Sequence, residues 1–208
     1  HVYWEQSLGY TFEHPFPLPQ GGGGVSAVAM DSQENLWVFQ RNAPGDPQLF
    51  KFTKDGKLMF TVGDDVIVHQ EKAHGMKVDA EDNVWICDAT AATIKKLSPD
   101  GKLLMTIGKY GERGDWVESK GQRLLWQPLD LAFAANGDIY IAEGHGNESP
   151  NDTGRSPTNN VGAARVIHLD KAGNYINQWY GNSYGQGKFN MVHGIAVDPR
   201  NGDVWLGD

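Results

Sequence analysis

Two histidines, His74 and His193, occupy the same place in two copies of one sequence pattern. Each is followed by glycine and lies five residues before an aspartate, Asp79 or Asp198. Histidines that repeat in register are brought together where the repeats pack around a common axis. Three neutral imidazoles with one open position make a catalytic zinc site, so both histidines are candidate metal ligands. The alternative is that each His-Gly pair only begins a strand, with the imidazole capping a backbone group.

The repeated unit has the pattern of a β-hairpin. Its clear copies are residues 73–88 and 191–208, and weaker copies occur at 25–40 and 126–143. Apolar and polar positions alternate with the period of two that a half-buried strand requires, and Asp-Asn or Asn-Gly supplies the turn. The aromatic residues at equivalent places, which we expect to pack between sheets, are Trp37, Trp85, Tyr140 and Trp205.

A second strand pair follows each of the first three hairpins. Its copies, at 49–63, 94–108 and 166–181, each read as a strand, an Asp-Gly-like turn, a strand and a closing glycine. Four short strands per repeat are typical of a β-propeller blade. The predicted fold is therefore all-β, a propeller of about six four-stranded blades. Residues 25–208 supply about three and a half of these blades, after an N-terminal arm and Gly-rich linker at 1–24.

In a propeller, the first strand of each blade lines the central channel. His74 and His193 are then expected to face this channel, with Ser26 and Leu129 at the matching positions of the other two hairpins. In a ring of about six blades, a third histidine two blades further on would complete a three-histidine site. We expect it about 100 residues after His193, in a chain that continues beyond Asp208.

Composition argues against several classes of protein. The chain has 208 residues and a formal charge of -8 without a basic run, which argues against binding to nucleic acid or an anionic membrane surface. No apolar stretch approaches the roughly 20 residues that cross a bilayer. The chain begins with His1 rather than Met, which we interpret as processing or a fragment and which fits a secreted or periplasmic protein. The single cysteine, Cys87, lies in an apolar run and is predicted to be a buried small hydrophobic residue.

Two further side chains have types that suit a reaction. Arg41 follows the first hairpin, where the others carry Ala89 and Gly144; at the rim of a channel it can hold a carboxylate in a bidentate fork. Otherwise it is a surface arginine in a polar loop. His145 can act as a general base or acid near neutral pH, bind a metal, or be only a loop residue. The Gly/Asn/Ser/Pro-rich loop at 146–162 is predicted to lie near the channel mouth as a lid or binding surface.

The V-x-x-D, N-x-W, D, strand, DGK, strand, G pattern resembles NHL-type propeller repeats over nearly all of residues 25–208. Within that group, the His-containing copies resemble the peptidyl-α-hydroxyglycine α-amidating lyases and their bacterial relatives. The resemblance implies a site of three zinc-bound histidines, of which His74 and His193 match two. It also implies that Arg41 binds the carboxylate of the substrate.

The same resemblance implies a structural calcium ion held by the backbone carbonyls of Val28 and Met76. One position departs from the family. The lyases carry a tyrosine that acts on the substrate hydroxyl where this chain has His145, as bacterial relatives often do. Tyrosine and histidine differ in pKa, so this exchange alters the proton chemistry available to the site.

The function that the resemblance implies is a metal-dependent lyase. It would cleave the C–N bond of a carbinolamide and release an amide and glyoxylate from a small-molecule or peptide substrate that carries a carboxylate. The alternative is a non-catalytic NHL propeller that binds a protein or glycan on its rim, since propellers host many functions. A lactonase-like hydrolase is disfavoured, because those propellers place acidic calcium ligands at the channel positions, which here hold Ser, His, Leu and His.

Overall fold

Antiparallel sheets make up most of the chain. The computed structural model describes residues 23–67, 73–144, 164–181, 189 and 192–207. The strands of the first two four-stranded sheets are β1 (Val25–Met30), β2 (Leu36–Gln40), β3 (Leu49–Phe52), β4 (Leu58–Val62), β5 (Ala73–Val78), β6 (Val84–Asp88), β7 (Thr93–Leu97) and β8 (Leu103–Gly108). The third such sheet and the last hairpin are formed by β11 (Pro128–Phe133), β12 (Ile139–Glu143), β13 (Arg165–Leu169), β14 (Tyr175–Tyr180), β15 (Gly194–Val197) and β16 (Val204–Gly207).

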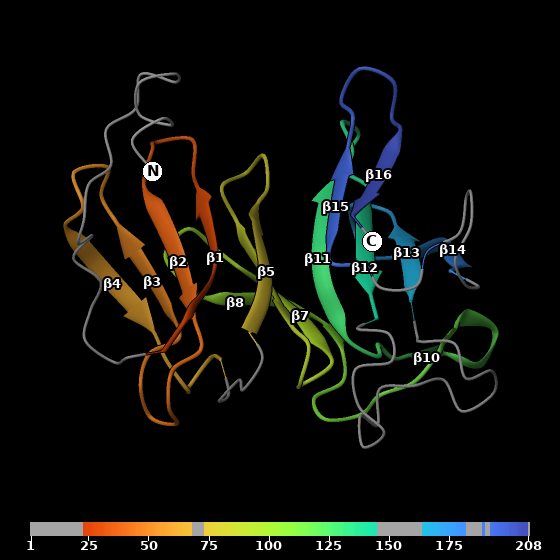
Figure 1. Ribbon diagram of the computed structural model, residues 1–208, viewed down its shortest axis with the longest axis horizontal. Coiled ribbons are helices and arrows are strands. Elements are labelled where there is room, and N and C mark those ends of the chain that lie inside the picture. Colours follow the sequence, from red (N-terminus) through yellow and green to blue (C-terminus); the bar gives the residue numbers. More distant parts are fainter. Residues whose placement is uncertain (1–22, 68–72, 145–163, 182–188, 190–191, 208) are drawn as a thin grey trace, which may run out of the picture.

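The sheets are arranged as consecutive blades. Within each sheet, neighbouring strands follow chain order, and Figure 1 shows the sheets fanning out across the view from β4 to β14. The first strands pack against one another in sequence, β1 on β5, β5 on β11 and β11 on β15. This arrangement confirms the predicted all-β propeller architecture.

The register of the hairpins follows the sequence pattern. The aromatic residues pair with equivalent positions of the first strands: Trp37 with Ala29, Trp85 with Lys77, Tyr140 with Ala132 and Trp205 with Ala196. The turns between the outer strands use Gly56, Gly101 and Gly173 at φ of 79°, 83° and 84°. Glycine adopts this left-handed conformation without steric cost, which explains the Asp-Gly signals in the sequence.

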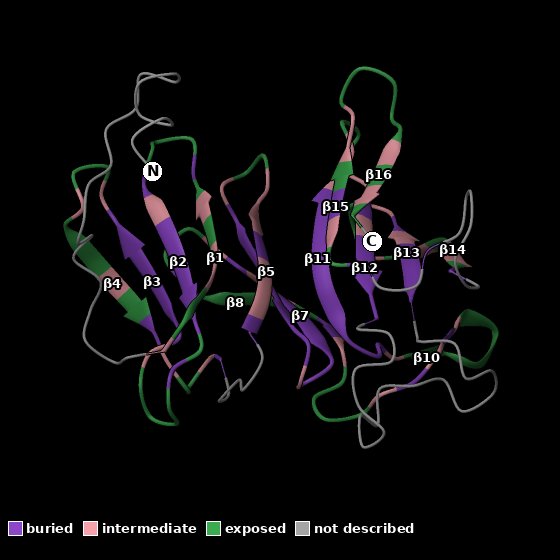
Figure 2. Cartoon of the chain, in the orientation of Figure 1, coloured by how far each residue is buried: buried purple, intermediate pink, exposed green. Residues whose placement is uncertain are grey.

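Apolar clusters fill the spaces between neighbouring blades. Trp37 packs with Met76 and Ile86 between the first two sheets, and Trp85 packs with Leu131 and Ile141 between the second and third. Figure 2 shows β2, β3 and β11 mostly buried and β4 mostly exposed.

The predicted packing of the four aromatic residues is confirmed in part. Trp37 and Trp85 are buried, and Tyr140 is partly buried against the cluster between the third sheet and the last hairpin. For Trp205 the prediction is wrong, since 65% of this residue is exposed. Its face of the hairpin is not covered by any strand in the described part of the chain.

Cys87 lies fully buried in β6, as predicted, and burial raises the pKa of its thiol well above the usual value. The segment between the second and third sheets contains β9 (Trp116–Val117), the short 3-10 helix η1 (Glu118–Lys120) and β10 (Gln122–Arg123). Within the described residues, no helix has the length and apolarity needed to cross a membrane.

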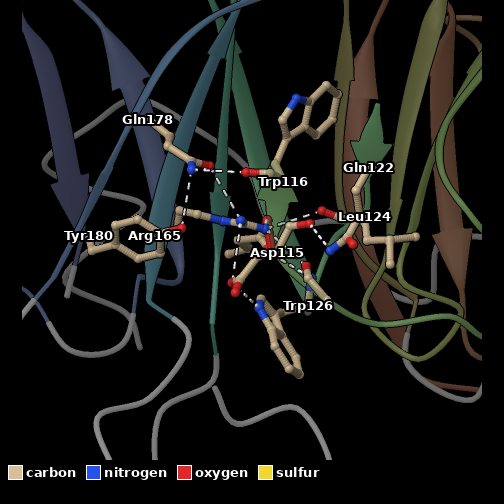
Figure 3. A network of polar contacts seen from close by, with 10 residues as sticks. Asp115, Trp116, Gln122, Leu124, Trp126, Arg165, Gln178 and Tyr180 are labelled. Carbon is tan, nitrogen blue, oxygen red and sulfur yellow. Dashed lines mark hydrogen bonds and ion pairs between the residues drawn. The ribbon is translucent and has the colours of Figure 1, made fainter. Parts of the chain in front are cut away.

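A buried arginine fixes this intervening segment to the third sheet. Arg165 donates from Nη2 to the Glu143 carboxylate at 2.9 Å and to the Leu124 carbonyl at 3.3 Å. Figure 3 shows its side chain reaching toward Asp115, with Gln178 on the same network. Burial raises the pKa of the Glu143 carboxyl, an effect that Arg165 opposes. The network therefore fixes the end of β12, two residues before His145.

Candidate metal and substrate site

The predicted site residues gather at one end of the inner strands. In every blade the first strand begins and the second strand ends at this side, because the two form a hairpin. His74 lies at the start of β5, His193 directly precedes β15, and Arg41 directly follows β2. His145 and the loop at 146–162 lie outside the described residues, so their predicted roles stay predictions.

The two histidine rings lie close together although β11 separates their strands. Their centroids are 5.5 Å apart and their planes differ by 16°. The Nδ1 atom of His74 lies 2.8 Å from the backbone oxygen of Leu129. A carbonyl oxygen only accepts hydrogen bonds, so Nδ1 carries the proton and the lone pair of the neutral ring is on Nε2. Metal-binding histidines are commonly oriented by such a hydrogen bond from their other nitrogen.

The glycine after His74 has a steric cause. A β-carbon on Gly75 would lie 2.4 Å from the backbone oxygen of Leu129, so a larger residue would push β5 away from β11. No heavy atom lies within 4 Å of the corresponding position on Gly194. The glycine after His74 thus allows β5 and β11 to approach closely. Among the described residues, no such contact explains the glycine after His193.

Arg41 reaches across from the first blade to the second. Its Nε donates to the Ala73 carbonyl at 2.9 Å, and its Nη2 lies 3.5 Å from Ser26 Oγ. Ser26 in turn donates to the carbonyls of Ala73 and His74. Arg41 is exposed. Its two hydrogen bonds anchor the guanidinium beside the backbone of His74. The sequence indicated Ser26 only as a channel position, because its contacts depend on how two blades meet.

Val28 and Met76 occupy matching places in neighbouring inner strands, opposite Val38 and Ile86. The Met76 side chain is buried, whereas Val28 is 58% exposed. A calcium ion bound to their carbonyls stays a prediction. The described residues contain no group of three or more His, Cys, Asp or Glu side chains that could hold a metal. They supply two of the three predicted imidazoles.

A buried carboxylate adjoins the site. Asp88 pairs with Ala73, the residue before His74, and is 1% exposed. Burial raises its pKa to about 6, although the backbone N–H groups of Ala91 and Thr90 donate to it. Among the described residues, its Oδ2 and the facing Thr93 Oγ1 have no hydrogen-bond partner. The sequence marked Asp88 only as the end of a strand, because its burial depends on the loop that follows.

Comparisons with known proteins point to one group. The chain is 25% identical to peptidyl-glycine α-amidating monooxygenase of Mus musculus over 236 aligned residues, which cover 99% of this chain and 22% of that protein. It is 27% identical to peptidyl-α-hydroxyglycine α-amidating lyase 1 of Drosophila melanogaster, with 91% and 37% covered. The chain thus spans about a fifth to somewhat over a third of the length of these relatives. No family model matches the sequence.

Among solved structures, virginiamycin B lyase from Staphylococcus aureus is similar in fold. The TM-score is 0.58 at 14% identity, and the match covers 92% of this chain and 50% of that one. At this identity the likeness supports the fold alone. Together with the sequence relatives, it shows that this chain forms part of a β-propeller in a lyase-like group that resembles the peptidyl-α-hydroxyglycine α-amidating lyases.

Proposed function

We propose that this chain is part of a metal-dependent amidating-lyase-like propeller enzyme, in which His74 and His193 bind one zinc ion. The observation that carries the proposal is the convergence of these two rings. Two imidazoles bound to one tetrahedral zinc through bonds of about 2.0–2.1 Å have ring centres about 5 Å apart. The centroids of His74 and His193 are 5.5 Å apart, and this separation supports the proposal.

The hydrogen bond from His74 to Leu129 adds to this fit. It places the lone pair on Nε2 and holds the ring at a fixed angle before any metal arrives. Because the contact comes from backbone packing between β5 and β11, the strands rather than the metal set the ring position. The proposal requires a third ligand in addition to His74 and His193. The calcium ion at Val28 and Met76 and a secreted or periplasmic location belong to the same proposal as predictions.

Arg41 is proposed to bind the carboxylate of the substrate. Two hydrogen bonds engage its Nε and Nη2, and a guanidinium has five N–H donors in a planar fork. An arginine anchored in this way can still present donors to a carboxylate without losing its orientation. Its place beside the His74 backbone suits a small substrate whose carboxylate and hydroxyl groups are only a few bonds apart.

The proposed reaction splits a carbinolamide. A divalent metal bound to the histidines would polarise the substrate hydroxyl and lower its pKa. A base removes the hydroxyl proton, the C–O bond becomes the aldehyde of glyoxylate, and the C–N electron pair stays on the amide nitrogen, which takes up a proton. His145 is the predicted carrier of this proton, since its ordinary pKa suits exchange near neutral pH.

The test is release of glyoxylate from a peptidyl-α-hydroxyglycine by the full-length, zinc-loaded protein. Arg41→Ala is expected to raise KM about 10- to 100-fold, the loss expected for a charge-assisted hydrogen-bond pair. Arg41→Lys is expected to recover only part of this, because lysine lacks the planar fork. Arg123→Ala is the matched control, since Arg123 of β10 is a surface arginine paired with Glu118 of η1. Absence of glyoxylate release with metal fully loaded, or equal effects at Arg41 and Arg123, would contradict the proposal.

A second candidate is a binding propeller without catalysis. The observation in its favour is that Met59, Leu104 and Ile176 are exposed at equivalent positions of the outermost strands. Exposed apolar side chains are typical of interaction surfaces where they form a contiguous patch. This candidate predicts that replacing the three residues by serine abolishes partner binding and that His193→Ala has no effect on it. The lyase proposal predicts that His193→Ala abolishes glyoxylate release and that the three serine substitutions have little effect on it.

A further inference from the structure

Asp130 lies between the two strands that carry the histidines. It belongs to β11, which packs against β5 on one side and β15 on the other. Lys77 Nζ in β5 donates to its carboxylate at 2.8 and 3.0 Å. The backbone N–H of Ile195 in β15 donates to Oδ2 at 3.3 Å. One buried carboxylate therefore connects both histidine-bearing strands across the strand between them.

The ion pair of Asp130 and Lys77 departs from the pattern of the repeated hairpins. At the position of Asp130, the other three hairpins carry Ala27, Gly75 and Gly194. At the position of Lys77, they carry alanine in every case: Ala29, Ala132 and Ala196. Charged residues thus stand at these two positions only where the hairpins of residues 73–88 and 126–143 meet.

The carboxylate also fills the space that the histidine motif leaves. A β-carbon on Gly75 would lie 2.8 Å from Asp130 Oδ1 and 2.4 Å from the Leu129 carbonyl. Glycine after His74 and aspartate after Leu129 are therefore complementary. Two neighbouring residues of β11 contact both histidine-bearing segments. The Leu129 carbonyl accepts a hydrogen bond from the His74 ring. The Asp130 carboxylate accepts one from the backbone N–H of Ile195, two residues after His193.

We propose that Asp130, together with Lys77, is a positioning residue that sets the separation of the His74 and His193 rings. This proposal concerns the same metal site, and its importance for catalysis rests on the proposed function. Asp130 acts on the rings through the backbone of β11 and β15. Removing it should let β15 shift relative to β5, which would move the rings apart and weaken any metal that both must bind.

The matched control is the ion pair between Lys51 and Asp31. Its atoms are 3.0 Å apart and both side chains are buried. It lies at the opposite end of the first blade, where Asp31 closes the turn between β1 and β2. Loss of either ion pair is expected to lower the melting temperature. Only loss of the ion pair of Asp130 should change the distance between the His74 and His193 rings.

The experiment uses the full-length protein with Asp130→Ala, Asp130→Asn, Lys77→Met and Asp31→Ala. The first readout is titration with Co²⁺, followed by the d–d absorption of the tetrahedral ion. Asp130→Ala is expected to weaken Co²⁺ binding about 10- to 100-fold, the usual effect of losing a residue that orients metal ligands. Asp130→Asn and Lys77→Met should give smaller losses, because the link to Ile195 is kept. Asp31→Ala should bind Co²⁺ like the wild type.

The second readout needs no metal. In the metal-free wild type, an NMR cross-peak between ring protons of His74 and His193 is expected from their stacking. It should weaken in Asp130→Ala and persist in Asp31→Ala. If the wild type binds no Co²⁺, the proposed metal function fails, and the cross-peak alone decides the role of Asp130. If Asp130→Ala does not fold, Asp130→Asn and Lys77→Met give the same test. A wild-type cross-peak in the variants, or an equal loss in Asp31→Ala, would overturn the inference.

Discussion

The hairpins at 73–88 and 192–207 share their motif but differ in their surroundings. Trp85 is 2% exposed and donates from Nε1 to Asp79, whereas Trp205 at the equivalent position is 65% exposed. Gly75 is crowded by β11, whereas Gly194 meets no neighbour within 4 Å among the described residues. The difference teaches that the repeat pattern specifies a hairpin and its register, while the blade on the far side determines what is buried. Within the described residues, the same motif position is therefore packed in one copy and exposed in the other.

The largest expected difference between the two hairpins concerns their tryptophans. In the 208-residue chain, Trp85→Ala is expected to lower the free energy of unfolding by about 3–5 kcal/mol, because it opens a cavity between two blades. Trp205→Ala should change it by about 0.5 kcal/mol or less, as for other exposed side chains. Urea denaturation measures both. A similar loss at both positions would show that Trp205 is covered by another part of the protein.

Asp88, at the end of the first of these hairpins, predicts a pH effect. Its pKa is raised from 3.8 to about 6, mainly by burial, while Lys95 and Arg113 oppose the shift. Between these values the folded chain keeps a proton that the unfolded chain releases, so stability falls as pH rises through this window. The expected contribution is a loss of about 3 kcal/mol, complete above the folded pKa.

Replacing Asp88 by Asn should remove this slope. The difference in unfolding free energy between wild type and Asp88→Asn, measured from pH 3.5 to about 7.5, isolates the group from other carboxylates. The amide can also donate to Thr93 Oγ1, which has no hydrogen-bond partner in the part of the chain that the structure describes. Asp88→Asn is therefore expected to be the more stable protein at neutral pH. A difference that does not vary with pH would contradict the raised pKa.

The smallest expected difference concerns the two glycines. Gly75→Ala should cost about 1–3 kcal/mol, because its β-carbon would meet the backbone of β11. Gly194→Ala should change stability by less than about 1 kcal/mol, since the added methyl group meets open space. Thermal unfolding of both variants measures this. Equal costs would indicate that a neighbouring strand also approaches Gly194.

The sequence predicted the local structure better than the packing. Strand alternation and Asp-Gly turns are short-range features, so the four hairpins, their register and the blade order were predictable. The exposure of Trp205 was not, because burial at this position depends on a neighbouring strand rather than on the hairpin. Likewise, the histidine register predicted that His74 and His193 share the channel, but the contacts of Ser26, Leu129 and Asp130 arise only where separate blades meet.

The central claim is that His74 and His193 bind one divalent metal together. The most direct measurement is zinc content of the purified full-length protein by elemental analysis, compared among wild type, His74→Ala, His193→Ala and the control His168→Ala. His168 is paired with Asp138 in the third blade and lies away from the site. The account predicts close to one zinc per chain in wild type and His168→Ala, and most of it lost in each of the other two variants, because one ligand of three is removed. Zinc retained at full content in His74→Ala or His193→Ala would contradict it.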